Sequence, residues 1–401
     1  MSRRFTAPGQ VAIAGYAHTQ VVRHAEATLG ALTVDTARAA VADAGLTMAD
    51  VDGFVGSTLL PTAGSHQTVD GISIVSPTWL AQQLGVDPRY AAGFTGIGQI
   101  PGSVALAVNA IVSGAAEVVV LHRALHNPRE GSYHGNVSTG FGGPMQWTAP
   151  QGYFGPLAMI ALPTNEYMQR YGASREDLAR VVVEARRNGS RLPWSYWHDQ
   201  PLDADDYLAS PPLFDPICRF DCDIPVDGVA TFVFTTAERA RDLPHPPVYV
   251  AGYGTSALQR HRMPLHWPLD DIMDGGRTAA RRIWEHSGLG PGDVDLPQVY
   301  DGFSPFVWYW LEVLGFCPEG EAARFVADGG IDSDRPGALP ALSGGGALGS
   351  GRMHGIPQML ECYLQLSRRA GARQRDASVG LACHSSPHFG GAVVYTAEPT
   401  S

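Results

Sequence analysis

Residues 36–54, TARAAVADAGLTMADVDGF, return later in the chain as residues 279–303, AARRIWEHSGLGPGDVDLPQVYDGF. An earlier pair, VAIAGY at 11–16 and VYVAGY at 248–253, precedes both stretches. Internal similarity of this kind indicates a duplicated structural unit. Five residues of the first copy match the second at one constant offset: Gly45, Leu46, Asp50, Val51 and Asp52 correspond to Gly288, Leu289, Asp293, Val294 and Asp295.

The repeated unit alternates predicted strands with predicted helices. Short apolar runs bounded by Gly, Pro or Asp are typical of buried strands, as in VAIAG, VDGFVGS, EVVVLH, VYVAGYG, LPQVYDG and SVGLACH. LTVDTARAAVADAG and WPLDDIMDGGRTAARRIWEHSG have helical periodicity and end at glycine. A third, looser pair, 102–122 and 355–384, adds a further helix and strand to each copy. We therefore predict an α/β fold made of two duplicated βαβαβ-type halves.

Three regions follow from the repeat. We predict a first half at 1–122, a cover segment at 123–240 that completes it, and a second half at 241–401. The middle region is rich in Gly, Pro, His and aromatic residues and contains one clear helix at 175–189. Long irregular segments in compact proteins are usually functional.

Composition excludes several kinds of chemistry. All 28 basic residues are arginine, so Schiff-base aldolases, pyridoxal enzymes and P-loop enzymes are excluded. The net charge of −11 argues against a nucleic-acid partner or an anionic membrane surface. Five irregularly spaced cysteines and the absence of a long apolar run lead us to expect a cytoplasmic protein with reduced thiols.

Three further stretches carry a family resemblance. CDIPVDGVATFVF (222–234), GGGALGSGRMHG (344–355) and PHFGGAVVY (387–395), together with the duplication, resemble the thiolase superfamily, in its sterol-carrier or lipid-transfer branch. YDGFSPFVWYWLEVLGFC (300–317) resembles the steroid side-chain-cleaving aldolases of that superfamily. The resemblance implies α/β/α/β/α layers, a homodimer, and an OB-fold (DUF35) companion in a heterotetramer.

The sequence departs from thiolases at their catalytic positions. Aligned on the resemblance, Gln99 stands where a thiolase has its nucleophilic cysteine, and glutamine cannot form an acyl thioester. GSGRMHG places Arg352 near the position of the catalytic histidine of the GHPxG motif, with His354 two residues on. The second catalytic cysteine falls near His388, and Tyr300 begins the segment that replaces the H-D-C/A-F motif. These replacements argue against thiolysis and Claisen condensation.

Retro-aldol cleavage of a β-hydroxyacyl-CoA remains possible, because it needs a base, an acid and donors for the enolate oxygen. The resemblance implies a 17-hydroxy steroid C22-CoA substrate that yields a 17-ketosteroid and propionyl-CoA. Tyr300 is our first candidate for base or acid, and His354 and His388 are candidates for the complementary role or for binding the enolate oxygen. We expect Asp301 to orient one of these histidines. No cofactor is expected beyond the CoA of the substrate.

Other interpretations of the same residues stay open. Gln99 either donates to the enolate oxygen or fills the space of the cysteine, and Arg352 either contacts substrate or pairs with an acid. Gly345 and Gly346 either contact substrate or permit close backbone approach. A non-catalytic acyl-CoA- or lipid-binding protein that supports a partner enzyme is the alternative function.

Two clusters leave further alternatives. HRMPLH (261–266) and CHSSPH (383–388) bring histidines close together, but neither has the spacing of a metal site, so we predict none. The aromatic residues of 303–311 either line an apolar substrate pocket, meet a partner, or form a dimer core.

Overall fold

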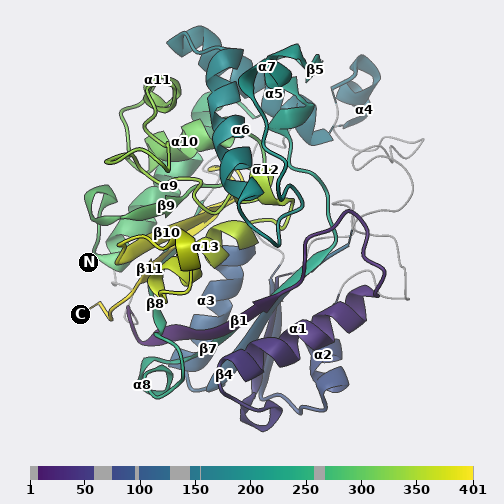
Figure 1. The fold of residues 1–401 in the computed structure, drawn as a ribbon, viewed down its shortest axis with the longest axis vertical. Coiled ribbons are helices and arrows are strands. Elements are labelled where there is room, and N and C mark those ends of the chain that lie inside the picture. Colours follow the sequence, from purple (N-terminus) through teal and green to yellow (C-terminus); the bar gives the residue numbers. More distant parts are fainter. Residues whose placement is uncertain are drawn as a thin grey trace.

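The computed structural model describes residues 8–57, 75–94, 99–126, 145–153, 155–256 and 267–400. Its main feature is a nine-stranded mixed sheet in the order β3-β2-β4-β7-β1-β8-β11-β10-β9. The two halves of this sheet meet at β1 and β8, which pair antiparallel at Ala12–Tyr249 and Ile13–Val248. Figure 1 shows the two halves stacked along the long axis of the molecule.

The first half contributes five strands, with β7 antiparallel to β1 and β4, and β2 parallel to β3 and β4. Its elements are β1 (Val11–His18), α1 (Leu29–Asp43), β2 (Gly53–Ser57), α2 (Pro77–Leu84), β3 (Tyr90–Phe94), α3 (Gln99–Val112), β4 (Val118–Leu125) and β7 (Gly228–Thr236). β4 extends past the predicted boundary at residue 122, and β7, which lies inside the predicted cover segment, adds a strand to this sheet.

The second half repeats this order with four strands. Its elements are β8 (Val248–Thr255), α9 (Leu269–Ser287), β9 (Leu296–Gln298), α10 (Pro305–Val313), α11 (Ala322–Ala327), α12 (Gly346–Ser350), α13 (Ile356–Leu366), β10 (Val379–His384) and β11 (Gly391–Thr396). Where the first half has α2 and β3, the described part of the second half has α10, α11 and α12.

The repeated aspartates explain why both copies fold alike. The Asp52 carboxylate accepts a hydrogen bond from the backbone N–H of Val118 at 2.9 Å, at the start of β4. The Asp295 carboxylate accepts one from the N–H of Val379 at 3.0 Å, at the start of β10. The strand register is the same in both copies, because Gly53 pairs with Val119 and Leu296 pairs with Gly380. The predicted duplication is therefore confirmed.

Three hydrophobic clusters separate the layers. α1 and α2 cover the outer face of the first half, and α3 and α13 lie between the two halves. α5 (Gly155–Tyr171), α6 (Arg175–Ser190), α9, α10 and α11 form the outer cluster of the second half. Successive side chains of β4 point to opposite faces of the sheet. Val118 and Val120 point to the outer cluster, and Val119 and Leu121 point to the central one. The arrangement is the predicted α/β/α/β/α layering.

The cover segment also contributes short elements: α4 (Met145–Thr148), α7 (Ala204–Ala209), α8 (Ala237–Ala240) and a two-stranded ribbon of β5 (Pro212–Phe214) and β6 (Ile217–Cys218). Its helix α6 confirms the helix predicted at 175–189. No described helix is long and apolar enough to cross a membrane.

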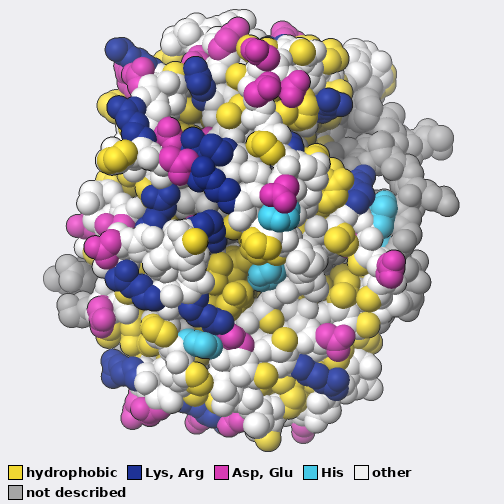
Figure 2. All heavy atoms as spheres, in the orientation of Figure 1, with side chains coloured by type: hydrophobic (Ala, Val, Ile, Leu, Met, Phe, Trp, Pro, Cys, Tyr) yellow, Lys and Arg dark blue, Asp and Glu magenta, His cyan; other side chains and the backbone are white. Residues whose placement is uncertain are grey.

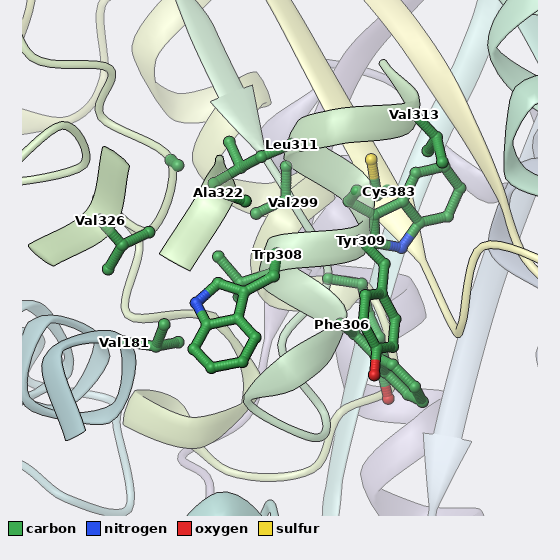
Figure 3. Packing of buried hydrophobic residues seen from close by; sticks show 14 of the residues in the cluster. Val181, Val299, Phe306, Trp308, Tyr309, Leu311, Val313, Ala322, Val326 and Cys383 are labelled. Carbon is green, nitrogen blue, oxygen red and sulfur yellow. The ribbon is translucent and has the colours of Figure 1, made fainter. Parts of the chain in front are cut away.

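α10 is buried on every side, which corrects one expectation. Trp308 lies among side chains of α6 and α11, including Val181 and Val326, while Tyr309 and Phe306 point to another side of the helix (Figure 3). Trp308, Tyr309 and Trp310 are fully buried within this single chain. They are therefore part of its own core and are not available to a partner or to a dimer interface.

The surface arginines have acidic partners. Figure 2 shows arginine side chains gathered with acidic ones on the face seen in Figure 1. Arg191 forms a two-pronged pair with Asp334 at 2.7 and 2.8 Å, and Arg369 pairs in the same way with Asp43. Exposed pairs of this kind contribute little to stability. They matter here as a contrast with the buried arginines described below.

Candidate active site

The candidate site lies where both halves of the sheet meet α3. The ends of β4, β9 and β10 and the first residue of α3 bring polar side chains into one buried region. Ends of parallel strands are common places for sites in α/β proteins. Among the residues brought together here are Gln99, Arg123, Tyr300, Arg352, His354 and His384, as the contacts below show.

Gln99 begins α3 in a left-handed backbone conformation, with φ of 22°. A non-glycine residue with positive φ is strained, and such strain is typical of functional positions. The Gln99 side-chain oxygen Oε1 accepts a hydrogen bond from Nη2 of Arg123 at 3.0 Å. The Gln99 amide is thus held by a cation.

Arg123 is a buried cation without a carboxylate partner in the described part of the chain. Its side chain is fully buried, and Nη1 donates to the Ser57 hydroxyl at 2.8 Å and to the Ser57 carbonyl at 3.2 Å. Burial lowers its pKa to about 9, so the guanidinium is still protonated at neutral pH. An uncompensated buried charge is costly, which indicates a site prepared for a negative charge.

Tyr300 lies two residues after the end of β9, close to the strand end at which it was expected, and is 5% exposed. No hydrogen bond reaches its hydroxyl from the residues that the structure describes. Its pKa is raised well above the ordinary value, first by burial and then by the carboxylates of Asp223 and Asp301, while Arg123 lowers it. Tyr300 is therefore a neutral phenol at neutral pH, which makes it a proton donor in the resting site.

His384, the last residue of β10, lies next to Tyr300, with ring centroids 5.2 Å apart. Its side chain is buried, and neither ring nitrogen has a hydrogen-bond partner among the described residues. Burial, followed by the positive charges of Arg123 and Arg352, holds its pKa well below the ordinary value. The imidazole is neutral and has a ring nitrogen free to bind a ligand.

Arg352 and His354 lie on the turn that leads into α13. The backbone N–H of Arg352 donates to Ile224, and its Nε lies 3.7 Å from the Asp223 carboxylate. The ring of His354 is 5.9 Å from that of His384. Gly355 follows with φ of 80°, and a Cβ there would lie 2.4 Å from the His384 ring. The glycine therefore lets both histidines approach one another.

Asp301 has a different task from the one expected. Its carboxylate accepts hydrogen bonds from the N–H groups of Ala347 at 2.6 Å and Leu348 at 3.0 Å, and from the side chain of Gln358 at 2.9 Å. Burial raises its pKa to about 7. These bonds hold the start of α12, and no hydrogen bond to a histidine is described for this carboxylate.

The two predicted glycines line this same turn. A Cβ on Gly346 would lie 2.2 Å from the Asp301 carboxylate, and one on Gly345 would lie 2.7 Å from the backbone of Gly189 in α6. Both have positive φ. Their contacts favour the close-approach interpretation over substrate binding.

His388 lies apart from the other candidates in its described contacts. Its ring packs on Trp267 at 4.4 Å, its Nδ1 is 2.8 Å from the Ser386 hydroxyl, and a Cβ on Gly275 of α9 would meet it. Burial lowers its pKa to about 4. The 261–266 histidines lie outside the described residues, and among the described ones no group of three metal-ligating side chains occurs.

Sequence reasoning missed three residues of the site: Arg123, Asp223 and His384. Arg123 interrupts the apolar run of β4, and a charge inside a buried strand was a usable signal. His384 was noticed only as part of a metal pattern. Asp223 gave no sequence signal, because its surroundings come from Tyr300 and Arg352, both distant along the chain.

Comparison with known proteins identifies the family. Residues 263–395 match the family model described as "Thiolase C-terminal domain-like". The chain is 33% identical to the "Steroid side-chain-cleaving aldolase" of Thermomonospora curvata, over 88% of this chain and 89% of the relative. It is also 33% identical to the "17-hydroxy-3-oxo-4-pregnene-20-carboxyl-CoA lyase" of Mycobacterium tuberculosis, over 89% of this chain and 92% of the relative.

Solved structures extend the comparison to the whole fold. The structure described as "Ltp2-ChsH2(DUF35) aldolase" superposes with a TM-score of 0.83 at 29% identity, and 98% of each chain is covered. Human mitochondrial 3-ketoacyl-CoA thiolase shares the fold, with a TM-score of 0.66 at 15% identity over 98% of this chain and 99% of the thiolase. The resemblance seen in the sequence is confirmed, and the chain belongs to the thiolase-like family of steroid side-chain-cleaving aldolases.

Proposed function

We propose that this enzyme cleaves the side chain of a 17-hydroxy steroid C22-CoA ester by a retro-aldol reaction, giving a 17-ketosteroid and propionyl-CoA. The observation that carries the proposal is the similarity, over nearly the whole chain, to two curated proteins named for this kind of cleavage. The site chemistry supports it, because the resemblance puts Gln99, which cannot form an acyl thioester, at the position of the thiolase nucleophile.

The reaction places a negative charge on the thioester oxygen when the carbon–carbon bond breaks. In our proposal Arg123 supplies the positive charge that stabilises this enolate, and the neutral His384 donates a hydrogen bond to it. Prearranged donors in a buried site are worth far more than the same donors in water. Burial, followed by the positive charges of Arg123 and Arg352, keeps the imidazole of His384 neutral, so it donates through its single N–H.

The enolate carbon then needs a proton. Tyr300 is the donor in our proposal, because burial keeps its phenol protonated at neutral pH. His354 shares the region of His384 and assists the enolate side. The steps are two proton transfers and one carbon–carbon cleavage, with no change that needs an oxidant or reductant, and we propose that no metal and no cofactor takes part beyond the CoA of the substrate.

Partners form a separate part of the proposal. The neighbouring solved structure carries a DUF35 protein in its description, and we propose that this chain also works with an OB-fold protein of that kind. A homodimer that binds two such partners, a heterotetramer, is the assembly we propose. We place the enzyme in the cytoplasm.

The test is incubation of the purified chain with 17-hydroxy-3-oxo-4-pregnene-20-carboxyl-CoA, with and without a co-purified OB-fold partner. We expect equal amounts of 17-ketosteroid and propionyl-CoA by liquid chromatography and mass spectrometry. Tight binding of the ester without either product, in both samples, would instead support the non-catalytic acyl-CoA-binding alternative.

A further inference from the structure

Two buried aspartates, Asp223 and Asp301, act on the pKa of Tyr300, and a third, Asp221, lies two residues before Asp223. Asp223 differs from the other two. Asp221 accepts hydrogen bonds from the Tyr207 hydroxyl at 2.8 Å, from the Ser304 hydroxyl and from the N–H of Cys218. Asp301 accepts the three hydrogen bonds from Ala347, Leu348 and Gln358 described above. Asp221 and Asp301 are both fully buried. Asp223 is 8% exposed, and no hydrogen bond to its carboxylate is described. Buried carboxylates normally have hydrogen-bond partners, so Asp223 needs an explanation.

The backbone fixes Asp223 between the two catalytic-site segments. Its N–H donates to the carbonyl of Gly302 at 3.3 Å, and the preceding Cys222 forms a β-bridge with Phe303. On the other side, the carbonyl of Ile224 accepts from the N–H of Arg352 at 2.9 Å. This short extended segment is tied to the Tyr300 turn and to the Arg352 turn, so the carboxylate has little freedom.

The charged surroundings of Asp223 are few. From the segment after β9 it faces Tyr300 and Asp301, and from the turn before α13 it faces Arg352, whose Nε is 3.7 Å away. The thiol of Cys222 is its chain neighbour. Burial, followed by the Asp301 carboxylate, raises the pKa of Asp223. A carboxylate with a raised pKa is better matched to proton exchange near neutral pH than an ordinary one.

We infer that Asp223 is the base that removes the hydroxyl proton of the substrate, and that it later passes this proton on to Tyr300. The inference rests on the proposed function. The Asp223 carboxylate takes the proton of the substrate hydroxyl, and the oxygen of that hydroxyl becomes the carbonyl oxygen of the ketone. The carbon–carbon bond breaks, and its electron pair forms the thioester enolate. Tyr300 gives its phenol proton to the enolate carbon, and the phenolate recovers a proton from the Asp223 carboxylic acid. No proton is gained or lost overall.

The experiment compares Asp223→Asn with wild type under the conditions that give cleavage. We expect ketone formation to fall by about 10²-fold or more, since general-base contributions are usually about 10²–10⁴-fold. Binding of propionyl-CoA, measured by calorimetry, should stay within about twofold, because asparagine keeps the shape of the side chain. Asp223→Glu should keep more activity than Asp223→Asn, because it retains a carboxylate that accepts protons.

Chemical rescue separates a base from a structural residue. Formate should restore part of the cleavage in Asp223→Ala, and it should have no effect on Tyr300→Phe. Asp221→Asn is the matched control two residues away: we expect a lower melting temperature but continued cleavage by the folded protein.

The outcomes distinguish the two proposals. Cleavage by wild type together with near-normal cleavage by Asp223→Asn would overturn the role of Asp223 and leave the proposed function standing. Loss of cleavage in Asp223→Ala without rescue by formate would also overturn it. Absence of cleavage by wild type with its partner would overturn the proposed function, and the role of Asp223 with it.

Discussion

Nη2 of Arg123 donates to Oε1 of Gln99 over 3.0 Å and so ties β4 to the first residue of α3. The same guanidinium also donates to Ser57 at the end of β2. A thiolase would have its nucleophile at the position of Gln99, as the sequence resemblance implies. In this chain the side chain at that position accepts a hydrogen bond from a buried, positively charged guanidinium.

Replacing Arg123 with methionine should abolish most of the cleavage and leave the protein folded. The variant keeps an unbranched chain of similar length but loses the charge that stabilises the enolate, and groups of this kind are worth about 10²–10³-fold in kcat. Arg123→Lys should recover only part of this loss, because an ammonium cannot hold Ser57 and Gln99 with one planar group. Steady-state kinetics and thermal melting check both expectations, and unchanged kcat in Arg123→Met would remove Arg123 from the site.

Tyr300→Phe should lose cleavage by about 10²-fold or more and keep its melting temperature. Only the hydroxyl is removed, and no hydrogen bond to that hydroxyl is described, so the fold loses little. Tyr309→Phe is the matched control, because Tyr309 is a buried tyrosine whose hydroxyl lies 3.4 Å from Thr164, in the core around α10. Equal activity of the two variants would contradict the assignment of Tyr300 as the proton donor.

His354→Ala and His388→Ala should behave differently, although both residues were candidates in the sequence. His354 lies next to His384, and we expect its loss to reduce turnover more than tenfold. Groups that transfer a proton usually contribute about 10²–10⁴-fold. His388 packs on Trp267 and should affect stability more than turnover. Rates measured at saturating substrate decide the matter, and a reversed order would exchange the two roles.

Asp301 should make stability depend on pH. The folded protein holds the Asp301 proton up to about pH 7, whereas the unfolded chain releases it near the ordinary value of 3.8. The folded state therefore binds more protons between these values, and this contribution to stability falls as pH rises across the window. In Asp301→Asn the melting temperature should fall less steeply with pH between about 4 and 7 than in wild type. Parallel curves for the two proteins would show that Asp301 does not titrate in this range.

The absence of lysine gives a test of the reaction type. Borohydride added with substrate or ketone should leave activity unchanged, because all 28 basic residues are arginine and no side-chain imine can form. Mass spectrometry should find no reduced adduct except at the amino terminus. A reduced adduct at an internal residue would contradict a mechanism without a covalent bond between enzyme and substrate.

The sequence predicted the fold well because the duplicated residues have local tasks. Gly45 and Gly288 end helices with φ of 71° in both copies, and Asp52 and Asp295 each bind the start of a strand. Such roles depend on neighbours within one unit, so they appear as repeats. The same reasoning failed for α10, whose burial comes from α6, α9 and α11 at once, and no periodicity along one helix reveals that.

The site was predicted only in part, for a related reason. Gln99, Arg352 and Tyr300 stand at motif positions, so a family resemblance could find them. His384 gains its significance from buried ring nitrogens without hydrogen-bond partners among the described residues, and Asp223 gains its own from burial beside Tyr300 and Arg352. That property depends on how distant segments pack, and it is not encoded in the spacing of residues.

The common register of β2–β4 and β9–β10 gives the site a hidden symmetry. Counting from Gly53 opposite Val119 and from Leu296 opposite Gly380, Ser57 corresponds to Tyr300 and Arg123 corresponds to His384. One pair is linked by a hydrogen bond of 2.8 Å, and the other by rings 5.2 Å apart. Equivalent strand positions thus relate a cationic pair in the first half to an aromatic pair in the second. An ancestor made of two identical units would have carried the same pair twice, and divergence after duplication left a guanidinium and a hydroxyl in one copy and two aromatic rings in the other.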